Sequence, residues 1–254
     1  MLGKFFSPII SSLSNITQDE GQVTAHSAIT GTITSPISEP ASTFARLCQA
    51  AHLTGRVLRH HRSKGTPEDE LFREASSLYV ELSDLARVLI DEASATQDYL
   101  SLVSPMAVTF SAIAALCDPY ACQTMRVENN TSEGATMQIQ AIDGIRSVAE
   151  SIRNFAQEIT NLVSSPSPSN PSHPSHNSLQ SRELDKVSPL ILDALYSGAS
   201  NFAWDVRESG NASSEEGLGT IRECLRLFTS KWRCAGEYLR VLEAQEFTYA
   251  VGHT

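Results

Sequence analysis

The sequence predicts an all-α protein, a multi-helix bundle with a low-complexity linker and a weakly ordered N-terminal arm. Two observations predict this class. Long stretches repeat apolar residues at alternating steps of three and four, which places them on one side of a helix. No segment sustains the apolar–polar alternation of a strand between turn residues. We therefore expect five or six long helices that pack within the chain at small angles.

The helical domain is expected over residues 41–250, because the flanking and interrupting segments have a different composition. Residues 1–40 are rich in Ser, Thr and Ile without a clear period, which predicts a weakly ordered arm. Residues 164–181 are mostly serine, proline, asparagine and histidine. Such a segment buries little apolar surface, so we expect a disordered linker in which His173 and His176 are free imidazoles.

The first helix is expected over residues 44–62. On a helix with about 100° per residue, six residues share an apolar face that we expect to be its core side. These residues are Phe44, Leu47, Cys48, Ala51, Gly55 and Leu58. The arginines near its C-terminal end suit the helix dipole.

The second helix is expected from Glu68 to about Glu92, with Thr66 as its cap and Pro67 at its first position. Its apolar stripe consists of Leu71, Ala75, Leu78, Leu82, Leu85 and Leu89.

The third segment, Tyr99–Cys117, has 19 residues without a charge and nearly reaches the length of a membrane span. Pro105 and four hydroxyl residues interrupt it, and no aromatic and basic anchors flank it. A fully buried helix of a large bundle has the same composition, and this is the interpretation we favour.

Three more helices are expected in the second half of the chain. The first has the stripe Ala141, Ile145, Val148, Ile152, Phe155, Ile159 and Leu162. The next is expected over Leu184–Val206, with Ile191, Leu195, Ala199 and Phe202 on one side. Gly217 and Gly219 predict a turn, and Thr220 with Glu223 predicts a capping box that begins the last helix. The stripe of that helix is Ile221, Leu225, Phe228, Trp232, Ala235, Leu239 and Leu242.

Charge and cysteine content exclude some functions. The net charge of −10 argues against a chain that binds nucleic acid as a whole, although a local basic patch remains compatible with it. An odd number of cysteines without two-residue spacing indicates a reducing compartment and no zinc ribbon. They are Cys48, Cys117, Cys122, Cys224 and Cys234. Cys48 and His52 could supply two zinc ligands, but a structural site needs four, so no metal is expected.

Recognisable catalytic motifs are absent, which predicts that the chain is not an enzyme. It has no nucleophile elbow, no P-loop, no zinc-protease motif and no dinucleotide fingerprint. The acidic pairs Asp91–Glu92 and Asp205/Glu208 are expected to be solvated. The arginines of the first helix are spread around it, so it is not expected to read DNA bases.

Three segments, in this order, resemble the fungal binuclear zinc cluster (Zn2Cys6) transcription factors. They are ARLCQAAHLTGRVLRHH at 45–61, ALCDPYAC at 115–122 and KWRCAGEYLRVLEAQEF at 231–247. MQIQAIDGIRSVAESI at 137–152 fits a helix between them. The matching positions, which we expect to be structural, are Gly55, Arg56, Val57, Leu58, Arg59, His60, Asp118, Pro119, Tyr120, Trp232, Ala235, Gly236, Tyr238 and Leu239.

The resemblance implies an all-helical regulatory region of a nuclear transcription factor, similar to the C-terminal half of such a factor. Family members bind two zinc ions through an N-terminal cluster of six cysteines, which this sequence lacks. We therefore expect no cofactor, no DNA-binding residues and no direct DNA binding. The expected partners are other transcription-regulatory proteins, a full-length relative among them, with no membrane and no identifiable small molecule. The chain would then be a fragment, a truncated product or a paralogue without its DNA-binding domain.

Two alternatives stay open. One is an α-helical enzyme-like or ligand-sensing domain with a pocket between its helices. The other is a scaffold that dimerises through its last helix, whose apolar stripe is long enough for this.

Overall fold

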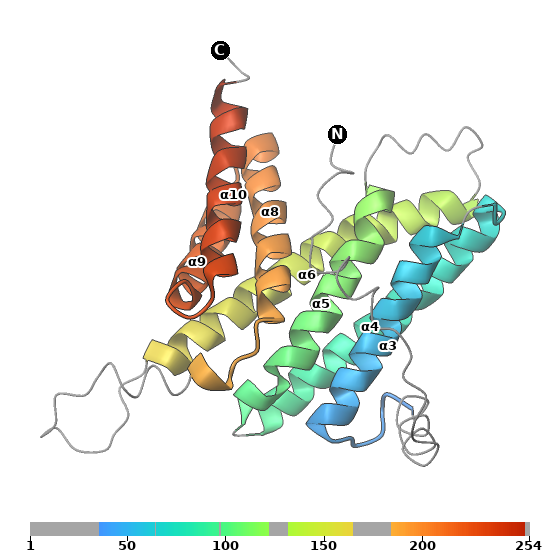
Figure 1. The fold of residues 1–254 in the computed structure, drawn as a ribbon. Helices are drawn as coiled ribbons and strands as arrows, with labels where there is room; N and C mark the ends of the chain where they lie inside the picture. The colour runs from blue at the N-terminus through green and yellow to red at the C-terminus, as the bar shows by residue number, and fades with distance from the viewer. Residues whose placement is uncertain (1–35, 64, 97, 122–131, 165–183, 252–254) are drawn as a thin grey trace, which may run out of the picture. The chain divides into compact units, whose positions relative to one another are not determined.

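The structure, a computed structural model, confirms the all-α class. It describes residues 36–63, 65–96, 98–121, 132–164 and 184–251, and this part of the chain contains no strand. Seven helices of 17 or more residues make up most of it (Figure 1). They are α3 (Thr43–Arg62), α4 (Glu68–Ala95), α5 (Tyr99–Ala121), α6 (Ser132–Ser164), α8 (Ile191–Ser209), α9 (Ala212–Phe228) and α10 (Arg233–Val251).

The chain divides into two compact units, residues 1–145 and 146–254. The division lies inside α6, so the first half of this helix belongs to one unit and the second half to the other. The sequence predicts one domain over 41–250 and places its interruption at 164–181. Of that expected linker, only Ser164 lies within the described residues, where it ends α6.

In the first unit, α3 and α4 pack against α5. The core side of α4 agrees with its predicted stripe, since Ala75, Leu78, Leu82, Leu85 and Leu89 are all fully buried. Leu71, the first residue of that stripe, is only half-buried. α4 begins as expected at Glu68, but its N-cap is Pro67 and not Thr66, and no side chain caps it. Three acidic residues in its first turn complement the helix dipole instead.

α5 is the central helix of this unit. Among the described residues it is the one helix long and apolar enough to cross a membrane, and 72% of its most apolar window is buried inside the protein. Thirteen of its 23 residues are buried. This burial agrees with the core helix that the uncharged run predicts.

The predicted core side of α3 is wrong. Phe44 is 68% exposed, Ala51 is exposed, and the other four residues of that face are only half-buried. The helix buries a neighbouring face that includes three polar side chains. Its buried residues are Ala45, Arg46, Gln49, Ala50, Leu53, Val57 and His60. A helical wheel ranks faces by apolar content, so it misses a face whose polar groups have partners elsewhere in the fold.

In the second unit, α8 packs against α9 and α10. The apolar residues predicted for α8 are buried, although the helix begins at Ile191 and not at Leu184. The predicted single last helix is two helices. α9 begins at Ala212 with Asn211 as its cap, and a turn over 229–232 separates it from α10.

Gly217 and Gly219 lie inside α9, which corrects the predicted turn. Gly217 is there because of packing, since a Cβ at this position would come within 2.9 Å of the Phe202 ring. Gly198 on α8 has the same role, since its Cβ would lie 2.7 Å from a methyl carbon of Ile152. The close contact of α8 with α6 and with α9 therefore depends on two glycines.

Replacing two helical glycines of the second unit by alanine should change stability in opposite directions. Gly198→Ala should lower the free energy of unfolding by about 1–3 kcal/mol, because the added methyl overpacks the contact with Ile152. Gly219→Ala should raise it by up to about 1 kcal/mol, because alanine favours the helix and nothing lies within 4 Å of its Cβ. Both tryptophans lie in this unit, so urea unfolding followed by tryptophan fluorescence measures both variants. Equal effects would contradict this packing.

Candidate functional site

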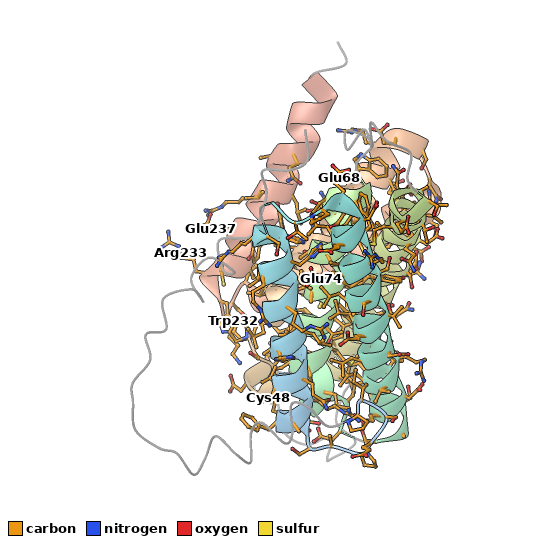
Figure 2. The ribbon with its side chains drawn as sticks, turned by 90° about the vertical axis from the view of Figure 1, so that its right-hand side faces the viewer. Cys48, Glu68, Glu74, Trp232, Arg233 and Glu237 are labelled. Carbon is orange, nitrogen blue, oxygen red and sulfur yellow. The ribbon has the colours of Figure 1, made fainter. Side chains whose placement is uncertain are left out.

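Three basic side chains of α3 bind three carboxylates of α4. Arg46 pairs with Glu92, Arg56 pairs with Glu81, and His60 lies 2.7 Å from Glu74. The position on α4 falls as the position on α3 rises, so the two helices are antiparallel and the pairs occupy three levels along them. We call these three pairs the α3–α4 ladder. Glu74 lies on α4 beside α3 (Figure 2).

Arg46 is fully buried, and its guanidinium has a partner for each nitrogen. Nε donates to both carboxylate oxygens of Glu92 at 3.1 and 3.2 Å. The two terminal nitrogens donate to the carbonyl oxygens of Ile37 and Glu39 at 2.8 and 2.9 Å, and one of them also donates to Gln49 at 3.0 Å. A buried charge is tolerated when it is paired and hydrogen-bonded in this way.

These contacts correct two predictions. Glu92 is not a solvated surface residue, because it is the counter-ion of a buried arginine. Residues 36–40, predicted to be part of the weakly ordered arm, include two carbonyl groups that Arg46 holds against the start of α3. In the second unit Asp205 likewise accepts a hydrogen bond, from the hydroxyl of Ser214.

His60 links α3, α4 and α5 at the opposite end of the ladder. It is 3% exposed, with Nδ1 facing the carboxylate of Glu74 and Nε2 lying 2.6 Å from the hydroxyl of Tyr120 on α5. When Nδ1 donates to the carboxylate, Nε2 accepts the Tyr120 O–H, and both ring nitrogens of the neutral imidazole are satisfied. Phe72 packs edge-on against the Tyr120 ring at 6.0 Å between centroids.

A carboxylate, an imidazole and a hydroxyl in this order could in principle activate a nucleophile. Burial, together with the negative charge of Glu74, raises the pKa of Tyr120 to about 12. Its hydroxyl is thereby held protonated, and the residue is 9% exposed. An activated nucleophile needs the opposite, a lowered pKa and access to substrate. The arrangement suits a structural link between helices.

The first two segments of the zinc cluster resemblance meet at this link. Arg56 and His60 belong to the first segment, and Tyr120 belongs to the second, 60 positions further along. Burial raises the pKa of the adjacent Asp118, and Pro119 is half-buried. The other residues of the first segment lie on both sides of α3. Val57 is buried, Gly55 and Leu58 are half-buried, and Arg59 is exposed.

The third segment lies in the second unit, at the start of α10. Ala235 is fully buried, and Tyr238 stacks on Tyr196 of α8 with 4.8 Å between ring centroids. Trp232 stacks on Phe228 at 5.2 Å, across the turn that separates α9 from α10. Leu239 is buried and Gly236 is half-buried. The residues of this segment thus hold α10 against α8 and α9.

The cysteines form no metal site among the described residues, where no group of three or more metal-binding side chains occurs. Cys48 is half-buried and His52 is exposed. Cys117 and Cys224 are buried, and burial raises the pKa of each thiol to about 12. Cys234 is exposed, and Cys122 lies outside the described residues.

Sequence reasoning missed Arg46, Gln49 and Glu92. One signal in the sequence could have indicated this pair. Arg46 lies next to the apolar face of one helix, and Glu92 lies near the far end of the next, so the two meet if the helices pack antiparallel. The assignment needs the register between the two helices, however, and only the fold provides it.

His61 follows His60 in sequence and should make the stability of the first unit sensitive to acid. Burial, with a smaller contribution from His60, lowers the pKa of His61 from 6.5 to about 4. Between these pH values the unfolded chain binds more protons at this position, so the contribution of His61 to stability is complete above pH 6.5 and is lost toward pH 4. His61→Gln should therefore lose less stability than the wild type over this range.

The measurement is urea unfolding followed by circular dichroism at several pH values between these limits. The difference between the two proteins isolates His61, because groups with the opposite dependence, such as Asp118 with its raised pKa, are present in both. Parallel stability curves for the wild type and the variant would contradict the assignment.

Comparison with known proteins provides no family for this chain. No protein-family model matches the sequence, and no curated protein or solved structure gives a significant match. The resemblance to zinc cluster factors therefore depends on the three quoted segments, and the function that it implies is a proposal.

Proposed function

We propose that the chain is an all-helical regulatory region of a transcriptional regulator, which acts in the nucleus through contacts with other regulatory proteins. In this proposal it has no catalytic activity, binds no zinc of its own, and needs a partner to reach DNA. A full-length relative with a zinc cluster is one such partner.

The observation that carries the proposal is the contact between His60 and Tyr120, at 2.6 Å. These residues belong to two different segments of the resemblance, which the chain separates by 60 positions. Unrelated segments that match a family by chance have no reason to meet in space. Residues that a family retains in order to pack its helices would meet in this way.

Arg46, Arg56 and His60 of α3 pair with carboxylates inside the fold, which supports a role without direct DNA reading. Arg46 is buried, so its guanidinium is not available to a phosphate or a base edge, and Arg56 is paired with Glu81. Recognition of a DNA groove needs several such side chains on one exposed face. The net charge of −10 further disfavours nonspecific binding to the phosphate backbone.

The full chain, fused to a foreign DNA-binding domain and placed upstream of a reporter gene in a yeast, should change reporter output relative to the DNA-binding domain alone. His60→Ala should abolish the change because it removes the link between α3, α4 and α5. His52→Ala is the matched control from the same segment and should keep the effect, because His52 is exposed. Output is normalised to the amount of fusion protein.

The unfused chain should form no sequence-specific complex with DNA at roughly 50–200 mM salt, a range over which nonspecific binding falls steeply. Unchanged reporter output at equal protein abundance would contradict the regulatory role. A complex that keeps its sequence preference across the salt series would contradict the proposed need for a partner.

A further inference from the structure

α3 has an apolar face that is partly exposed. It consists of Phe44, Leu47, Cys48, Ala51, Gly55 and Leu58, and we call it the α3 outer face. Phe44 is 68% exposed and Ala51 is exposed, while the remaining four residues are half-buried. Cys48 lies in the second turn of the helix (Figure 2). Single exposed apolar residues are ordinary, but a continuous apolar face along a helix indicates a binding surface.

Gly55 leaves room for a docked segment, because no described neighbour lies close to it. Glycine inside a helix is destabilising relative to alanine. A Cβ at Gly55 would meet no atom within 4 Å, whereas one at Gly198 would meet Ile152 at 2.7 Å. Close packing against Ile152 thus explains why position 198 is a glycine. At Gly55 there is open space instead, in the middle of the outer face. A docked segment could approach the helix closely at this point.

The charges around the face restrict what can cover it. α3 contains no acidic residue, and three basic side chains, His52, Arg59 and Arg62, are exposed on it. Two of them lie near its C-terminal end. A complementary segment is therefore apolar along most of its length and negative at the end that lies beside Arg59 and Arg62.

The chain contains such a segment close to α3 in sequence. Residues 5–16 include six large apolar side chains and no charge, and Asp19 and Glu20 follow after Thr17 and Gln18. The apolar residues are Phe5, Phe6, Ile9, Ile10, Leu13 and Ile16. From Glu20 to Pro36 the chain can span roughly 55 Å when extended, at about 3.3–3.6 Å per residue. α3, with 20 residues, is about 30 Å long at 1.5 Å per residue, so the connection can reach along all of it.

We infer that residues 5–20 dock on the α3 outer face, with the apolar residues over Leu47 and Gly55 and with Asp19 and Glu20 beside Arg59 and Arg62. A tethered segment binds at a high effective concentration, which no separate partner has. A second copy of α3 fits less well, because both helices would bring basic residues and no acidic one. This inference does not depend on a role in transcription.

The thiol of Cys48 reports the docking directly, since it lies on the covered face. The rate of alkylation by iodoacetamide is measured for each cysteine of the full chain by mass spectrometry. Ile9→Asp with Leu13→Asp should release the segment and speed alkylation of Cys48 by at least about threefold, because thiol reactivity follows exposure. Ser11→Asp with Ser12→Asp adds the same charge and should leave the rate unchanged. Cys234, which is exposed in the second unit, is the internal standard.

An unchanged rate at Cys48 in Ile9→Asp with Leu13→Asp would overturn the proposal. A second result would also overturn it. If Cys48 reacts more slowly in the wild type than in the variant, but this difference disappears when the protein is diluted, then a second copy of the chain covers the face. Cys117 is buried, and its alkylation detects unfolding. If the variant unfolds, a chain without residues 1–20 is tested with a synthetic peptide of residues 1–20. Protection of Cys48 by this peptide and not by a scrambled one supports docking, and equal protection by both, or by neither, contradicts it.

Discussion

The buried guanidinium of Arg46 is the interaction on which the first unit most depends. It joins the segment before α3, the start of α3 and the end of α4 through five acceptor atoms on four residues. α5 is uncharged apart from Asp118 and must be covered by other helices, but apolar burial alone sets no register between them. Arg46, Arg56 and His60 bind carboxylates at three levels of α4, so sliding one helix along the other would separate three pairs at once.

The three pairs do not contribute equally. Arg56 and Glu81 are each about one-third exposed, and water screens such pairs, so their contribution to stability is small. Arg46 has 1% of its side-chain surface exposed, and removal of one partner of a buried pair leaves uncompensated polar groups. His60 differs again, because its link to Tyr120 is a hydrogen bond that also reaches α5. The ladder is therefore fixed at its two ends, and the middle pair adds little.

The use of these basic residues inside the fold also determines what remains outside it. The side of α3 with the polar partners faces α4 and α5, and this orientation turns the more apolar face, with Phe44 and Gly55, away from the described core. One helix thus has two different sides, an internal one specified by polar pairs and an external one that is apolar with a basic end. We account for the second side by the proposed docking of the N-terminal segment.

The sequence predicts much of the fold where apolar spacing alone decides it. α4 and α8 each bury one face, whose large aliphatic residues recur at steps of three and four, and these core sides agree with those expected. The predicted core side of α3 was wrong because Arg46 and His60 are buried through their contacts with Glu92 and Glu74. These partners lie 46 and 14 positions further along the chain, and a local sequence pattern does not contain them. The break between α9 and α10 was missed because the apolar spacing continues through the turn, where Trp232 stacks on Phe228. For the candidate site, the sequence locates the two segments that contain His60 and Tyr120, but it does not predict the contact between these residues.

Hydrogen exchange of the α3 amides in Arg46→Met and Arg87→Met tests the central claim most directly. Arg87 is the matched control, because its pair with Asp84 is more than half exposed on both sides. The loss of Arg46 should lower the free energy of opening of α3 by about 3 kcal/mol, and the loss of Arg87 should change it by less than about 0.5 kcal/mol. Equal protection of α3 in the two variants would contradict the role of the buried guanidinium.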